Sequence, residues 1–130
     1  MIHDRKVWRL AVLGLLLAPS AVVAQAVNVQ GDWNVTIVSK AEGTLHGFAS
    51  FLQEGTSVMG WVGPSASDPI KITGVLKAGK FTIQTFPQPG RTVAFAVSEV
   101  IVDGERMTGT IDGDKGTIEF VRDHARDGHP

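Results

Sequence analysis

The chain has no cysteine, which excludes several kinds of chemistry at once. Without thiols there is no disulfide, no thiolate metal ligand, no cysteine nucleophile and no lipid-modified N-terminal cysteine. An excess of positive charge is also missing, because 12 Lys and Arg residues stand against 13 Asp and Glu residues. The sequence therefore gives no indication of nucleic acid or an anionic membrane as a partner.

Long hydrophobic runs are scarce, and the longest lies near the start of the chain, at residues 10–18. Three basic residues precede it, and Ala24 and Ala26 offer small-residue cleavage sites after it. The run is well short of the roughly 20 residues that span a bilayer. Residues 1–26 are therefore predicted to be a cleaved signal peptide of a periplasmic or secreted protein, rather than an uncleaved anchor.

Removing this segment takes away three basic residues and one acidic residue, so the net charge falls from −1 to −3. A mature chain of about 100 residues can bury roughly 60–70 % of its unfolded surface in one core. We expect a single domain over residues 27–122, no transmembrane segment in the mature protein, and a flexible C-terminal tail over residues 123–130.

Helical periodicity is missing too, and the mature chain instead alternates between apolar and polar residues in eight short runs. These runs are residues 33–38, 46–53, 57–62, 70–76, 80–86, 92–102, 106–111 and 117–122. They predict an all-β protein, an eight-stranded antiparallel up-and-down barrel, with a β-sandwich as the alternative.

Three X-Gly pairs between the runs predict tight two-residue turns, at Glu54-Gly55, Ala78-Gly79 and Asp103-Gly104. With these turns, apolar residues oppose each other: Phe51 and Val58, Leu76 and Phe81, Val100 and Met107, Ile111 and Ile118. Four glycines share that apolar face: Gly47, Gly60, Gly74 and Gly109. They favour the barrel over the sandwich, because strands in a small barrel must bend strongly.

The remaining connections, at residues 39–43, 63–69, 86–91 and 112–116, are longer and contain four prolines. In an up-and-down meander these loops all lie at the end opposite the tight turns. One end is thus expected to be closed and the other open, and binding is expected at the open end.

The run at residues 92–102 is compatible with two registers. A two-residue turn after it directs Ala94, Ala96, Ser98 and Val100 inward. A bulged turn would instead direct Val93, Phe95, Val97 and Ile101 inward, together with Glu99. We prefer the first register because it keeps the carboxylate of Glu99 in water.

Gly31-Asp32-Trp33 opens the first strand and Arg122 ends the last, so both belong to the tight-turn end. This arrangement resembles that of the calycins, the group that includes the lipocalins and the avidins. The resemblance implies a structural closed end made of Gly31, Trp33 and Arg122, in which the arginine covers the indole and satisfies backbone carbonyls. The chain is shorter than lipocalins and lacks the aromatic-rich biotin pocket of avidins, so the resemblance implies a fold but no ligand.

A second resemblance is to small exported bacterial proteins that repeat the phrase Asp-Gly-X-X-apolar-X-Gly-Thr, which is residues 103–110 in this chain. Most such proteins have no assigned activity. The resemblance therefore agrees with an exported barrel and leaves the ligand open.

Motifs of known enzymes are absent, including a Gly-X-Ser-X-Gly elbow and a phosphate-binding loop. His46 is expected to be a surface residue, and Asp112-Gly113-Asp114 lacks the other ligands of a calcium loop. His124 and His129 have no partner set at metal-binding spacing. We therefore predict no catalytic residue, no metal site and no cofactor.

Three functions remain as hypotheses. The preferred one is non-enzymatic binding of a small apolar ligand at the open end, with tentative interior contacts from Phe51, Ile72, Ile83 and Phe120. Whether the interior is a cavity or a solid core is left open. The second is an interface, for a homodimer or another envelope protein, on an outward apolar face made of Phe48, Leu52, Met59 and Trp61 and extended by Val93, Phe95 and Val97. The third is an enzyme without a recognisable motif.

Overall fold

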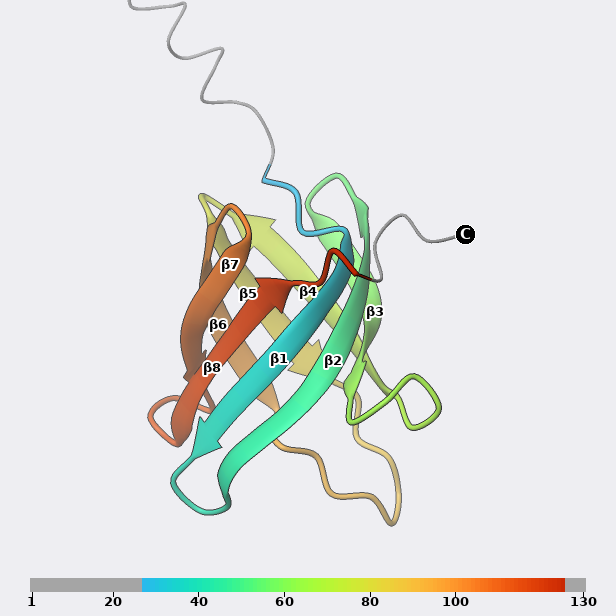
Figure 1. Cartoon of the computed structure of the whole chain (residues 1–130), viewed down its shortest axis with the longest axis vertical. Helices are drawn as coiled ribbons and strands as arrows, with labels where there is room; N and C mark the ends of the chain where they lie inside the picture. The colour runs from blue at the N-terminus through green and yellow to red at the C-terminus, as the bar shows by residue number, and fades with distance from the viewer. Residues whose placement is uncertain (1–26, 126–130) are drawn as a thin grey trace, which may run out of the picture.

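A computed structural model describes residues 27–125, and its eight strands form one closed antiparallel barrel (Figure 1). The strands are β1 (Gly31–Ser39), β2 (Gly43–Glu54), β3 (Ser57–Gly63), β4 (Ile70–Lys77), β5 (Lys80–Thr85), β6 (Val97–Asp103), β7 (Arg106–Ile111) and β8 (Gly116–Arg122). The all-β prediction and the barrel are confirmed. The predicted signal peptide and residues 126–130 lie outside the described residues.

Each strand pairs with the next one along the chain, and β1 also pairs with β8, which closes the sheet. The closing ladder runs from Trp33 opposite Arg122 to Ser39 opposite Gly116. Each strand therefore pairs with two neighbours, although residues 43–47 of β2 pair with β1 alone, and the barrel has no edge strand. Residues 27–125 include no helix of the length and hydrophobicity that crossing a membrane would take.

The face that each strand turns inward agrees with the predicted alternation. Trp33, Val35 and Ile37 of β1 are all buried, and in the β4–β5 hairpin Leu76 pairs with Phe81 as predicted. The connections also divide as expected, because the three tight turns share the end at the top of Figure 1 and the longer loops share the other. The barrel therefore has a tight-turn end and an open end.

Three predicted registers are wrong by two residues. Phe51 pairs with Gly60 instead of Val58, and Met107 pairs with Val102 instead of Val100. In the β7–β8 ladder Ile111 pairs with Gly116 instead of Ile118, and Met107 pairs with Phe120. The first two hairpins turn at Gly55-Thr56 and Gly104-Glu105, with glycine at positive φ in the first turn position. A shift of two residues leaves every side chain on its predicted face, so alternation alone did not distinguish the two registers.

The predicted strand at residues 92–102 is shorter than expected, since β6 begins only at Val97. Within β6 the preferred register is confirmed, because Ser98 and Val100 are buried and Glu99 is exposed. Before β6 the prediction is wrong: Phe95 is buried, whereas Ala96 is exposed. The chain leaves the ladder there and the alternation is interrupted.

Two side chains hold this irregular segment through hydrogen bonds to its backbone. The Asp112 carboxylate accepts hydrogen bonds from the N–H groups of Ala96 and Val97, at 2.8–3.1 Å. The Thr85 hydroxyl donates to the Phe95 carbonyl at 2.8 Å. These contacts satisfy backbone groups that a longer ladder would have paired, and they leave the Phe95 ring in the core.

The inward glycines mark places where neighbouring backbones approach closely. A Cβ added at Gly109 would collide with the carbonyl oxygen of Glu99, and one at Gly60 would collide with that of Ser50. At Gly74 the added atom would meet the ring of Phe81 instead. Side chains at the first two positions would force adjacent strands apart, which explains why glycine occupies them.

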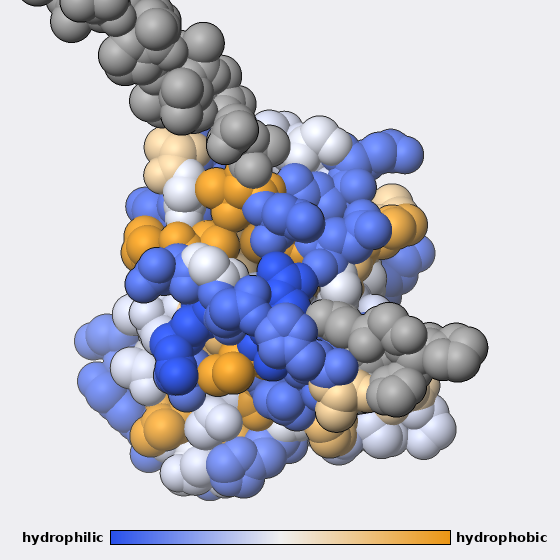
Figure 2. All heavy atoms as spheres, turned by 45° about the horizontal axis from the view of Figure 1, so that its top comes forward, coloured by the Kyte–Doolittle hydropathy of each residue, from blue (hydrophilic) through white to orange (hydrophobic). Residues whose placement is uncertain are grey.

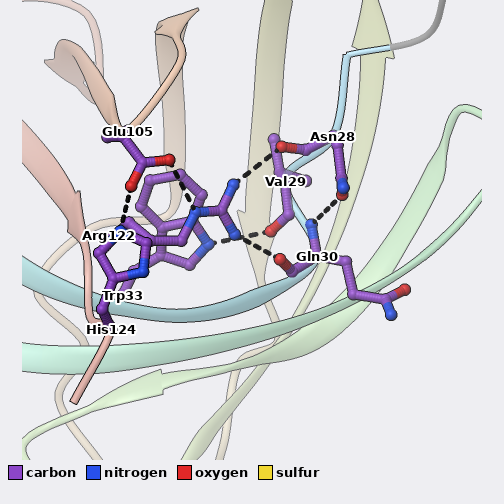
Figure 3. Close-up of polar contacts among 7 residues, drawn as sticks. All are labelled: Asn28, Val29, Gln30, Trp33, Glu105, Arg122 and His124. Atoms are coloured by element: carbon purple, nitrogen blue, oxygen red, sulfur yellow. Dashed lines mark hydrogen bonds and ion pairs between the residues drawn. The ribbon is translucent and has the colours of Figure 1, made fainter. Parts of the chain in front are cut away.

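At the tight-turn end, Trp33 is completely buried and its indole N–H donates to the Val29 carbonyl at 2.9 Å (Figure 3). The Arg122 guanidinium carbon lies 4.1 Å from the centre of the indole ring. Its two terminal nitrogens donate to the carbonyl oxygens of Gln30 and Asn28. The arginine thus covers the indole and binds the chain segment that precedes β1.

This segment, residues 27–30, is also fastened from β2. The Gln53 side chain accepts from the Val29 N–H and donates to the Val27 carbonyl, both at 2.8 Å. Glu105, in the β6–β7 turn, pairs with Arg122 at 3.7 Å and with His124. In Figure 2, which turns this end forward, hydrophilic residues cover most of the surface. The tight-turn end is therefore closed by packing and by hydrogen bonds together.

Replacing Gly109 with Ala should destabilise the barrel by about 1–3 kcal/mol, because the methyl group meets backbone that cannot move freely. Urea unfolding followed by circular dichroism measures this. Thr108→Ala, at the exposed neighbouring position, is the control and should change stability by less than about 1 kcal/mol. Equal unfolding midpoints for the two variants would contradict the close strand approach.

Replacing Trp33 with Ala should cost about 3–5 kcal/mol, because it leaves a cavity under the Arg122 guanidinium. Thermal unfolding of the variant against wild type measures the loss, and Trp61 leaves a fluorescence signal to follow. A melting temperature close to that of wild type would show that the indole does not support the closed end.

Candidate binding site at the open end

A cavity of about 450 Å³ lies at the open end of the barrel. Its walls are apolar side chains from the strands and from the β5–β6 loop, residues 86–96. The strands contribute Val35, Ile37, Leu45, Phe48, Val62 and Ile70, and the loop contributes Val93, Ala94 and Phe95. The cavity thus continues the inward faces of β1 to β4 toward the loops, and Phe48 lines it from the outward face of β2.

The cavity is confined to one half of the barrel because large rings fill the other half. Phe51 stands edge-on to Phe81, with ring centres 5.3 Å apart, and Phe120 packs on both Phe51 and Trp33. All four rings come from strand segments near the tight-turn end. Toward the open end the inward positions of β2 include Gly47, where a Cβ would meet the Gly63 carbonyl oxygen.

Two loops at the mouth of the cavity are joined by one arginine. Arg91 of the β5–β6 loop pairs with the Asp68 carboxylate at 2.8 Å and donates to the Asp68 carbonyl at the same distance. It also donates to the Pro69 carbonyl at 3.3 Å. Asp68 and Pro69 end the β3–β4 loop, so this contact fixes the two longest loops of the open end to each other.

Polar groups are few in the cavity and gather at its rim. Arg91 is the only Lys or Arg among the lining residues, and its charge is already matched by Asp68. Glu42 comes from the β1–β2 turn. His46, exposed on β2, lies 3.4 Å from the Thr36 hydroxyl. Apolar walls with a rim of paired charge suit an uncharged hydrophobic molecule better than an ion.

The predicted interior contacts Phe51, Ile72, Ile83 and Phe120 are all buried in the core, and none of them lines the cavity. Their contact with a ligand stays a prediction, and the structure places them in the filled part of the barrel. Sequence reasoning missed the lining residues instead. Val62 and Ile70 were recognisable, as inward positions at the open ends of their strands.

The predicted interface residues lie on the outer side of β2 and β3, but with corrected partners. Leu52 pairs with Met59 and Ser50 pairs with Trp61, whereas the predicted register placed Phe48 opposite Trp61. Phe48 pairs with Gly63 and contributes to the cavity lining. Phe95 does not extend this outer face, because it is buried.

No cluster of three or more His, Asp or Glu side chains within residues 27–125 is placed to hold a metal ion. No protein-family model, no curated protein and no solved structure matches the chain. Any function must therefore be argued from the cavity and from the surface of the barrel.

Replacing Arg91 with Met should loosen the β5–β6 loop with little effect on overall stability. The lost contacts are at the surface, where ion pairs contribute about 0–1 kcal/mol. Hydrogen exchange of residues 86–93 should become faster, while exchange in β6 should not change. Arg106→Met removes an exposed ion pair with Glu119 on the barrel wall and is the matched control. Unchanged exchange in the Arg91 variant would show that the arginine does not hold the loop.

Proposed function

We propose that this protein is an exported, non-enzymatic barrel that binds a small hydrophobic molecule in the cavity at its open end. The observation that carries the proposal is the apolar lining of that cavity, supplied by four strands and one loop. Small-molecule sites are typically hollows of about 300–1,000 Å³ with mostly hydrophobic walls and a few polar groups. The cavity has this size and this composition.

The construction of the barrel supports the same proposal. A ligand site needs a rigid support, and the packed rings of the tight-turn end supply one beneath the cavity. The strands that line the cavity belong to a closed hydrogen-bonded barrel, which supports their side chains. Only the loops at the mouth must move for a molecule to enter.

Membership of the calycins is part of the proposal. The packing of Arg122 on Trp33, and the hydrogen bonds from Arg122 to the chain before β1, correspond to the closed end that the calycin resemblance implies. Export is proposed from the signal-like residues 1–26, and the absence of a catalytic function from the lack of any enzyme motif. The lining residues favour a hydrophobic ligand of a size that fits the cavity.

Filling the cavity should abolish binding of a hydrophobic probe. We expect wild type to give a saturable fluorescence increase with N-phenyl-1-naphthylamine. Val62→Trp places an indole where the probe would lie, and should weaken its binding by about tenfold or more, equivalent to the loss of 1.4 kcal/mol. Ile101→Trp, on the outer face of β6 and away from the cavity, should bind like wild type.

Circular dichroism establishes that each variant is folded, and Ile70→Phe offers a smaller filling substitution if the tryptophan is not tolerated. Absence of saturable binding to wild type would contradict the proposal, as would equal binding by wild type and both filled variants. If wild type binds the probe and the filled variants do not, organic extraction of protein purified from its native host, followed by mass spectrometry, would identify the natural ligand.

A further inference from the structure

The outer surface of β2, β3 and β4 carries an apolar patch that the cavity does not explain. Leu52, Met59 and Val75 are 60 %, 55 % and 56 % exposed. Leu52 pairs with Met59 across β2 and β3, and Val75 lies diagonally next to Met59 on β4. They surround a hollow of about 490 Å³ on the outside of the wall.

An outer barrel face is expected to be polar, and the rest of β4 follows this rule with Lys71, Thr73 and Lys77. The three large apolar side chains are contiguous and not scattered singly. Contiguous exposed apolar surface of this kind marks an interaction site. The arrangement of the surrounding charges indicates which partner the patch fits.

Two opposite charges flank Met59 on this outer face, one on each side. Glu54 is the next outward residue after Leu52 on β2, toward the tight-turn end. Lys71 is two residues before Thr73, the β4 partner of Met59, toward the open end, where its ammonium lies 5.5 Å from the Phe86 ring. Met59 therefore lies midway along the line from Glu54 to Lys71.

We propose that two copies of this chain associate through this patch. When two sheets meet face to face, their two-fold axis lies in the plane of the contact. An axis through Met59, perpendicular to the line from Glu54 to Lys71, exchanges these two charges and passes beside Val75. It brings Glu54 of one copy over Lys71 of the second copy, twice in the dimer, and lets Met59 and Val75 meet their own counterparts.

The charge complementarity is what points to a second copy. A single patch carries both members of the ion pair, at positions that a two-fold axis brings together. Because like charges then avoid each other while the apolar centre is buried, the surface is complementary to itself. The dimer uses the outer wall of the barrel, so it does not depend on the proposed function of the cavity.

Sedimentation velocity of the wild-type protein, from low micromolar to several hundred micromolar, should show a monomer–dimer equilibrium. Val75→Glu places a charge at the centre of the contact and should give a monomer throughout. Val38→Glu is the matched control, because Val38 is a 48 % exposed valine on β1, outside the patch, and this variant should dimerise like wild type. Circular dichroism checks that each variant is folded.

Variants that reverse the two charges test the position of the two-fold axis. Glu54→Lys and Lys71→Glu should each weaken dimerisation by roughly tenfold, because each change turns two attractive contacts into repulsive ones. The double variant should recover the wild-type dissociation constant. A monomeric wild type, a dimer unaffected by Val75→Glu, or a double variant as weak as the single variants would each overturn the proposal, even if crosslinking captured a different protein on the patch.

Discussion

The ladder between β1 and β8 is the constraint on which the rest of the structure depends. It converts a meander of hairpins into a closed wall, and it places the first and last strands side by side. At its first rung Trp33 lies opposite Arg122, so the indole and the guanidinium meet only because the barrel is closed. The enclosed interior, the covered tight-turn end and the cavity all require this contact between strands that are far apart in sequence.

Closure also divides the interior into two unlike halves. Near the tight turns, Trp33, Phe51, Phe81 and Phe120 fill the space with ring contacts, and the segment before β1 covers them. Toward the loops the inward side chains are aliphatic and the strands diverge into longer connections. A cavity remains there because no ring reaches it from the strands except at its margin. The packed rings thus lie at one end of the barrel and the cavity, where we propose binding, lies at the other.

Sequence alternation predicted the fold and the inward face of every strand, because the period of two is a local property. It did not predict three registers, since pairing Phe51 with Gly60 or with Val58 presents the same face. It also misplaced Phe95, whose position depends on Asp112 and Thr85, contacts distant in sequence. The cavity lining was not predicted for a related reason. Its residues lie at the open ends of the strands, whereas the predicted contacts were the large inward side chains of the filled half.

The central claim is that the barrel is solid at one end and receives a hydrophobic molecule at the other. Methyl-group NMR of the wild-type protein, titrated with N-phenyl-1-naphthylamine, tests this most directly. The account predicts shifts at Leu45, Val62, Ile70 and Val93 that saturate together, with Ile83 and Val100 in the filled core little changed. Shifts confined to Leu52, Met59 and Val75 on the outer wall, or no saturable shift at all, would contradict it.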